Sequence, residues 1–224
     1  MRPWELLGET EAPDGTAMAL TRRSGEYVIL AGGESLMSSR MHGSEEALAT
    51  LGCEDARHLE APHVLVGGLG MGFTLRAALD LLPPGATVTV AELIPAVVDW
   101  NRGPLGPLAH HPLKDPRVRV DPRDVRLVLE TATAAFDAVL LDVDNGPAPF
   151  TSDDNATLYA DRGIAAIRRA LRPDGVLAVW SAREDRKFEQ RLRYGGFRAR
   201  AERVRGRLRK GGPHHVIFVA TLEA

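Results

Sequence analysis

Three glycines at alternate positions separate a short apolar run from a helical pattern. They are Gly68, Gly70 and Gly72. Glycine lets the backbone approach a ligand without a Cβ clash, and it tolerates the positive φ of a tight turn. The acidic Glu92 ends the next apolar run, about 20 residues later, where a carboxylate can accept hydrogen bonds from ribose hydroxyls. This layout predicts a nucleoside-cofactor site at the edge of a parallel sheet, lined also by Leu69, Met71 and Leu93.

Three further side chains are candidates for proton transfer or substrate contact. Asp142 ends the apolar run Ala138–Leu141, where open α/β sheets bind their ligands. It could anchor an amine or act as a general base, or it could be an ordinary turn or cap acid. Asp144 lies in an Asp-Asn-Gly-Pro run that either binds substrate or forms a turn. His42 precedes a predicted helix and could serve as a base, because histidine titrates near neutral pH.

The composition is that of a globular protein without a strong electrostatic preference. The chain has 224 residues and a net charge of −2, so we expect no general attraction to nucleic acid or to an anionic membrane. No apolar run approaches the roughly 20 residues that span a bilayer, and the N-terminus lacks a signal-peptide pattern. We therefore expect a cytoplasmic protein. The single Cys53 offers no metal cluster and the acids near Asp142 are too local to surround a divalent ion, so no metal is expected.

Strand and helix patterns alternate from Pro62 onward. The predicted strands are His63–Val66, Thr87–Ala91, Val118–Val120, Ala138–Leu141 and Val176–Trp180. The predicted helices are Thr74–Leu82, Pro95–Asn101, Val125–Thr131, Ala156–Leu171 and Asp185–Tyr194. This order predicts an α/β fold with a Rossmann-like, doubly wound, mostly parallel sheet covered on both faces. The last two strand patterns, Phe197–Arg205 and His215–Ala220, predict an antiparallel C-terminal hairpin.

The first part of the chain is rich in strand patterns. Ala17–Leu20 and Glu26–Leu30 flank a turn-like link and predict a β-hairpin. A short helix opened by Ser44 follows, with acids in its first turn. We expect a small β-rich subdomain over residues 1–52 and a cofactor-binding catalytic domain over residues 53–224.

Basic residues are dense and nearly alternate in the C-terminal hairpin. They are Arg198, Arg200, Arg203, Arg205, Arg207, Arg209 and Lys210. They could bind an anionic partner such as RNA, or their charge could guard an edge strand against self-pairing. The overall pI near 6.4 and the lack of interleaved aromatic residues favour the second interpretation, so we expect no nucleic-acid partner.

A dehydrogenase that binds a dinucleotide would begin with the same strand, glycines and acid. The patterns in this chain, however, predict no second domain that would hold a substrate against a nicotinamide. Its closing antiparallel hairpin is the usual ending of methyltransferase-type sheets. Both features favour an adenosyl-sulfonium cofactor over NAD.

Four segments of the chain resemble the spermidine synthase family, a branch of the class I S-adenosylmethionine-dependent transferases. They are Val64–Arg76, Val88–Val98, Asp115–Leu129 and Phe136–Pro147. The resemblance implies that the glycines and Glu92 hold the cofactor and that Asp142 faces the reacting centre. It also implies that Asp124 contacts the adenine amino group, with the Val125 backbone beside it, and that the protein is a homodimer. Asp124 is open to another interpretation, since it also stands where a helix N-cap is expected.

Several positions depart from the polyamine synthases of that family. Met71 stands where those enzymes have an Asp that holds the amine of decarboxylated S-adenosylmethionine, and a thioether is only a weak acceptor. The loop after Asp142 has a different spacing of acids, and the family's upstream Gln and Tyr-His-Glu segment are not matched. We therefore expect a methyltransferase that uses S-adenosylmethionine on a small-molecule acceptor. The alternatives are an aminopropyltransferase that uses decarboxylated S-adenosylmethionine and a non-catalytic nucleoside-binding protein.

Overall fold

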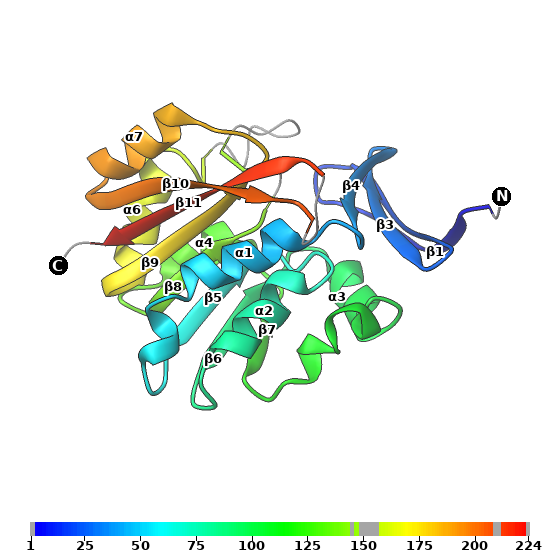
Figure 1. Cartoon of the computed structure of the whole chain (residues 1–224), viewed down its shortest axis with the longest axis horizontal. Coiled ribbons are helices and arrows are strands. Elements are labelled where there is room, and N and C mark those ends of the chain that lie inside the picture. Colours follow the sequence, from blue (N-terminus) through cyan, green and yellow to red (C-terminus); the bar gives the residue numbers. More distant parts are fainter. Residues whose placement is uncertain (1–2, 144–145, 148–156, 208–211, 223–224) are drawn as a thin grey trace.

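The computed structural model describes residues 3–143, 146–147, 157–207 and 212–222. These residues form a seven-stranded sheet with helices on both faces and a four-stranded antiparallel sheet at one end of the molecule (Figure 1). The predicted α/β fold class is thereby confirmed. Asp144 lies outside the described residues, as do Arg209 and Lys210.

The seven-stranded sheet has the order β10-β11-β9-β8-β5-β6-β7. Its strands are β5 (His63–Gly67), β6 (Thr87–Ala91), β7 (Val118–Asp121), β8 (Phe136–Leu141), β9 (Leu171–Ser181), β10 (Phe197–Arg205) and β11 (His214–Leu222). Strands β5 to β9 pair in parallel, whereas β11 pairs antiparallel with both β9 and β10. The predicted C-terminal hairpin is therefore present, and the carboxyl ends of β5, β6 and β8 meet at one edge of the sheet.

Helices cover both faces of this sheet because its central strands are apolar on both sides. The helices are α1 (Gly43–Gly52), α2 (Phe73–Leu81), α3 (Pro95–Arg102), α4 (Val125–Thr131), α6 (Asp161–Ala170) and α7 (Arg186–Tyr194). Along β5, Val64 and Val66 belong to the apolar cluster under α1, α2 and α3, while Leu65 belongs to the cluster under α4, α6 and α7. Because successive side chains of a strand point to opposite faces, each central strand contributes to the apolar core on both sides of the sheet.

The N-terminal sheet has the order β1-β2-β3-β4 and is antiparallel throughout. Its strands are β1 (Glu5–Glu11), β2 (Ala17–Arg23), β3 (Glu26–Ala31) and β4 (Glu34–Ser38). The sequence predicts only the central hairpin of β2 and β3. The outer strands escape prediction because most of their residues are exposed or half-buried, which leaves no apolar alternation to detect.

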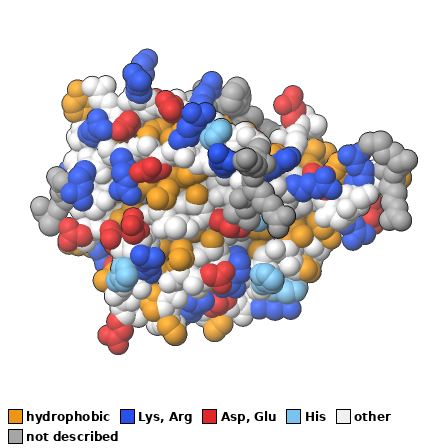
Figure 2. Space-filling model, in the orientation of Figure 1, with side chains coloured by type: hydrophobic (Ala, Val, Ile, Leu, Met, Phe, Trp, Pro, Cys, Tyr) orange, Lys and Arg blue, Asp and Glu red, His pale blue; other side chains and the backbone are white. Residues whose placement is uncertain are grey.

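The arginine-rich strand β10 forms one edge of the large sheet. Arg198, Arg200, Arg203 and Arg205 are exposed along it, and Arg200 forms ion pairs with Glu54 and Glu202. On the face drawn in Figure 2, basic side chains at this end of the molecule alternate with acidic ones. Among the described residues, no helix has the length and apolar character that crossing a membrane requires.

Gly52, at the end of α1, marks the closest approach of that helix to the sheet. A Cβ at this position would overlap the Leu140 side chain and lie 2.9 Å from the Ala178 Cβ. We expect Gly52→Ala to lower the unfolding free energy by about 1–3 kcal/mol, because the overpacking outweighs the better helix propensity of alanine. Denaturant titration measures the change. The control Thr50→Ala, at an exposed position of the same helix, is expected to stay within about 0.5 kcal/mol of the wild type, and an unchanged Gly52→Ala protein would refute this packing.

Candidate active site

The glycine loop connects β5 to α2 at the carboxyl edge of the sheet. Gly68, Gly70 and Gly72 have φ angles of 87°, 51° and 82°, which disfavour any other residue. A Cβ on Gly68 would lie 2.5 Å from the carbonyl oxygen of Asp142, and one on Gly70 would lie 2.8 Å from the Met37 Cε. The loop therefore depends on glycine for its conformation and for its close contact with the chain beyond β8.

Glu92 is locked in place at the end of β6. It is buried, and its two carboxylate oxygens accept hydrogen bonds from the backbone N–H groups of Leu69 and Ile94, both at 2.9 Å. Burial raises the pKa of Glu92, and these hydrogen bonds oppose that rise. Each oxygen keeps further acceptor capacity, so the carboxylate remains able to bind ribose hydroxyls. Leu93 beside it is 43% exposed, an apolar surface next to the acid.

Asp124 occupies the helix-cap position that the sequence allowed as an alternative. Its carboxylate accepts a hydrogen bond from the Arg126 N–H at 2.7 Å and caps α4. Val125 is buried, and its side chain lies where a Cβ on Gly67 would be, so it packs beneath the start of the glycine loop. The predicted contact of Asp124 with adenine stays a prediction.

Asp142 lies directly after β8 and shares the site with an acid from α1. Its carboxylate accepts a hydrogen bond from the Thr74 hydroxyl at 2.9 Å, and burial raises its pKa to about 6. Glu45 is buried in the first turn of α1. Burial, reinforced by the negative charge of Asp142, raises the pKa of Glu45 to about 8. Beside the glycine loop, Asp142 is thus close enough to Glu45 for its negative charge to oppose the ionisation of Glu45.

A serine and a histidine extend this acidic centre on the α1 side. The Ser44 hydroxyl lies 2.6 Å from the Glu45 Oε2 and 2.8 Å from the His215 Nδ1. Sequence reasoning missed Glu45, Ser44, His215 and Thr74. One signal was available, because Ser44, Glu45 and Leu48 share one face of a helix, and the apolar Leu48 indicates that this face is buried. The partnership with His215, 171 residues away, leaves no local signal.

Two other predicted residues lie close to this centre. The His42 ring stacks on Phe73, the first residue of α2, with ring centroids 4.1 Å apart, and its Nδ1 lies 2.7 Å from the Glu46 Oε1. Met71 is only 1% exposed and belongs to the apolar core. The structure therefore brings His42 to the glycine loop, whereas it buries the thioether on which the methyltransferase prediction depended.

The arrangement favours a cationic ligand. Two neighbouring carboxylates in a partly buried place repel each other, and a positive charge between them would relieve both the repulsion and the desolvation. Their raised pKa values also equip them to accept a proton near neutral pH. Within the described part of the chain, no three His, Cys, Asp or Glu side chains lie close enough together to hold a metal ion.

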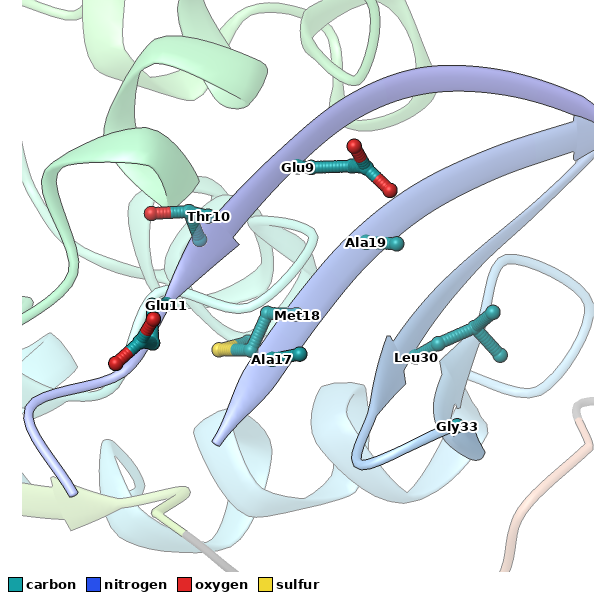
Figure 3. A pocket seen from close by; sticks show the side chains of 8 residues that line it. All are labelled: Glu9, Thr10, Glu11, Ala17, Met18, Ala19, Leu30 and Gly33. Carbon is teal, nitrogen blue, oxygen red and sulfur yellow. The ribbon is translucent and has the colours of Figure 1, made fainter. Parts of the chain in front are cut away.

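A separate surface groove lies on the N-terminal sheet (Figure 3). Its volume is about 540 Å³, and its lining includes Glu9, Glu11, Ala19 and Leu30. All its lining residues come from β1, β2, β3 and the turn that follows β3, so it shares none with the glycine loop. The groove is thus distinct from the candidate active site.

The chain is similar in sequence to three curated polyamine aminopropyltransferases, although no protein-family model matches it. It is 33% identical over 130 residues to the polyamine aminopropyltransferase of Pyrobaculum calidifontis, which covers 55% of this chain and 43% of the relative. It is 38% identical over 128 residues to polyamine aminopropyltransferase 1 of Streptomyces coelicolor, covering 55% of the chain and 23% of the relative. The match to polyamine aminopropyltransferase 2 of Pseudomonas aeruginosa is 33% over 126 residues, covering 54% and 34%. In each case the match covers less than half of the relative's length.

Solved spermidine synthases share the fold. The enzyme from Thermotoga maritima superposes with a TM-score of 0.75 at 18% identity, over 96% of this chain and 72% of the other. A spermidine synthase in complex with the transition-state analogue AdoDATO gives 0.74 at 17% identity, over 96% and 72%. A probable spermidine synthase from Corynebacterium glutamicum gives 0.65 at 17% identity, over 96% and 79%. The predicted likeness to the spermidine synthase branch is confirmed at the level of the fold.

These comparisons correct the prediction of a methyltransferase that uses S-adenosylmethionine. That prediction is wrong, because the relatives in sequence are named polyamine aminopropyltransferases and the structural neighbours are named spermidine synthases. The physical reason for the error is that it judged the acidity of the site chiefly from Met71, together with the changed loop after Asp142 and the unmatched upstream segments. The structure buries Met71 and gathers Glu45 beside Asp142, so the site is acidic without an acid at position 71.

The burial of Glu45 predicts a characteristic dependence of stability on pH. Because its pKa rises from 4.5 to about 8 on folding, the folded protein holds a proton that the unfolded chain releases. The contribution of Glu45 to the unfolding free energy therefore declines as the pH rises from 4.5 to about 8. We expect Glu45→Gln to be more stable than the wild type at pH 8 by roughly 1–3 kcal/mol, and to differ little near pH 4.5.

Denaturant titration of both proteins across this pH range measures the effect. Glu54→Gln is the matched control, because the Glu54 side chain is 58% exposed. An equal stability difference between Glu45→Gln and the wild type at both ends of the range would contradict the burial of this acid.

Proposed function

We propose that the protein is an aminopropyltransferase that moves the aminopropyl group of decarboxylated S-adenosylmethionine to a small amine acceptor of the polyamine class. The observation that carries the proposal is the pair of carboxyl groups, Glu45 and Asp142, beside the glycine loop. The names of the relatives in sequence support the reaction class. The fold shared with spermidine synthases supports the position of the site.

The donor suits the chemistry of both parts of this site. The glycine loop offers backbone approach for the adenosyl part, and Glu92 offers acceptors for ribose hydroxyls. The donor carries a positive sulfonium and an ammonium group, and it supplies the electrophilic carbon next to sulfur. An ammonium group beside Glu45 and Asp142 would favour the ionised form of both and so lower the pKa of each.

The acceptor must lose a proton before it reacts. At neutral pH an aliphatic amine is mostly protonated, whereas only the neutral amine has a lone pair to attack carbon. The donor keeps Asp142 and Glu45 ionised, and an ionised carboxylate beside the acceptor can take this proton, which gives the pair the role of general base. As the new C–N bond forms, the C–S bond breaks and its electron pair stays on sulfur, so 5′-methylthioadenosine leaves.

Glu45 takes the place of an acid at position 71 in this proposal. Met71 is buried in the core, so an amine-binding carboxylate has to come from another element. Glu45 comes from α1, which packs against α2 and the sheet and thereby holds the acid at the carboxyl edge. His42 and Asp144 remain candidates for contact with the acceptor, and the homodimer remains a prediction.

The reaction is tested by incubating the purified protein with decarboxylated S-adenosylmethionine and putrescine. We expect 5′-methylthioadenosine and an amine longer by one aminopropyl group to appear in equal amounts by mass spectrometry. Glu45→Gln and Asp142→Asn are expected to lower kcat/KM by roughly 100-fold or more, because each removes a charge at the reacting centre. Glu54→Gln keeps the wild-type rate. The absence of 5′-methylthioadenosine with putrescine and with longer polyamines would exclude the proposal.

We expect the affinity for decarboxylated S-adenosylmethionine to depend on pH, and the affinity for the product 5′-methylthioadenosine to be independent of pH. As the pH falls from 8 to 5, protonation of Glu45 and Asp142 removes the charges that attract the ammonium group, so donor affinity decreases. The product 5′-methylthioadenosine has no ammonium group, which makes it a matched neutral ligand. Isothermal titration calorimetry of both ligands measures the difference. A parallel loss of affinity for both ligands would show that the carboxyl pair does not bind the amine.

A further inference from the structure

The acidic centre is connected to the opposite side of α1 through Ser44. This serine is fully buried, and its hydroxyl lies between the carboxyl group of Glu45 at 2.6 Å and the Nδ1 of His215 at 2.8 Å. A hydroxyl donates one hydrogen bond and accepts others. When Glu45 is ionised, Ser44 donates to it and accepts from the Nδ1–H of His215. When Glu45 is protonated, both hydrogen bonds can reverse, which passes a proton from one end to the other.

We propose that Glu45, Ser44 and His215 form a proton path that carries the proton of the acceptor amine away from the reacting centre. This inference rests on the proposed aminopropyl transfer. Glu45 is the catalytic end of the path, while Ser44 and His215 are positioning residues that act through it. Asp142, in contrast, is hydrogen-bonded by Thr74 of α2 on its own side of the site.

The fold fixes the geometry of this path. The N-terminus of α1 is attached to the C-terminal hairpin, since the N–H of Gly43 donates to the carbonyl oxygen of Gly206 at 3.1 Å. In Figure 1 the β10–β11 hairpin accordingly reaches the beginning of α1. His215, near the start of β11, packs against the ring of Trp180 at 4.7 Å, which holds the imidazole toward Ser44. The hairpin thus contributes a side chain to a site otherwise built from α1, α2 and β8.

His215 is suited to the outer end of the path. It is half-buried, so one part of the ring meets Ser44 while another part is accessible to solvent. Burial lowers the pKa of His215, and the neighbouring His214 lowers it further, so the ring is neutral at pH 7 and readily releases to water a proton that it has received. The ammonium group of the donor lowers the pKa of Glu45 and thereby brings it closer to that of His215. The other titratable groups that act on the path are Asp142 and Glu46, whose charges raise the pKa of Glu45.

The proton balance of the step is complete without a further reactant. The acceptor ammonium gives its proton to the Glu45 carboxylate, and exchange with solvent brings the neutral imidazole into the Nε2–H form, so that Ser44 donates to Nδ1. Glu45 then passes a proton to Ser44 as Ser44 passes its own to the Nδ1 of His215, and the Nε2–H of the imidazolium releases a proton to water. The neutral amine attacks the carbon next to sulfur, and the C–S electron pair stays on sulfur. The ring is left in the Nδ1–H form, which donates to Ser44 while Glu45 is ionised, so the next cycle begins from the same state.

The substitution His215→Asn tests the path by kinetics. The asparagine amide can still hydrogen-bond Ser44 but takes up no proton. We expect kcat to decrease roughly 10-fold to 100-fold with an unchanged KM for the donor, and the pH profile of kcat to lose the contribution of the histidine. Added imidazole should restore part of the rate. His214→Asn, at the exposed neighbouring position, is the matched control and should keep the wild-type kcat.

Ser44→Ala interrupts the path in the middle and provides a second variant should His215→Asn fail to fold. It is expected to show the same loss of kcat, and imidazole should not restore it, because the link to Glu45 is absent. Wild-type kcat and pH profile in either folded variant would overturn the proposal.

The titration of His215, followed by NMR, tests the path without any activity. We expect the neutral ring of His215 to change from the Nε2–H to the Nδ1–H form as Glu45 ionises near pH 8, and to stay in the Nε2–H form in Glu45→Gln, because Ser44 reverses its hydrogen bonds only when Glu45 loses its proton. Identical titration curves would overturn the path, whatever the activity. If the curves differ but the wild type forms no 5′-methylthioadenosine, the path stands as a property of the structure and the proposed function fails.

Discussion

The site depends on one interaction, the electrostatic repulsion between the carboxylates of Glu45 and Asp142, which are close to each other and largely shielded from solvent. Each acid has a raised pKa, and the charge of Asp142 raises the pKa of Glu45. A folded protein tolerates such an arrangement only where hydrogen bonds or a ligand compensate for it. Thr74 and Ser44 supply one hydrogen bond to each acid. A cationic ligand would supply the remaining compensation, which is why the pair indicates an amine.

The backbone brings the adenosyl part of the site to the same edge. Gly68 allows the glycine loop to lie against the chain beyond β8, which makes this loop and Asp142 neighbours. The backbone N–H groups of Leu69 and Ile94 donate hydrogen bonds to the Glu92 carboxylate, which fixes the orientation of this side chain. The helices on either side of the sheet pack against it through apolar side chains. This packing fixes the relative positions of the glycine loop, Glu92 and Asp142. The site therefore joins a rigid glycine loop, where we propose that the adenosyl part binds, to an acidic centre.

Much of this arrangement could be predicted from the sequence. The apolar runs around β5, β6 and β8, with the glycines and Glu92 between them, determine the parallel sheet and the edge where Asp142 lies. These signals are local, because each depends on residues that are neighbours in the chain. The outer strands of the N-terminal sheet were not predicted, since β1 and β4 bury too little of their surface to show a pattern.

The acidic centre could not be predicted as a whole, because it is assembled from distant segments. In the sequence, Glu45 and Glu46 are two adjacent acids in the first turn of a helix. Only the packing of the helix shows that Glu45 is the one that faces inward. His215 reaches Ser44 across 171 residues. The wrong prediction of methyl transfer came from the same limitation. It treated the missing acid at Met71 as a missing charge in the site, although another element supplies that charge.

The most direct measurement is a crystal structure with decarboxylated S-adenosylmethionine bound. We expect the adenosyl part to lie along the glycine loop, with the ammonium nitrogen within hydrogen-bond distance of both Glu45 and Asp142. An ammonium group held by other residues, with Glu45 and Asp142 still facing each other unbound, would contradict it.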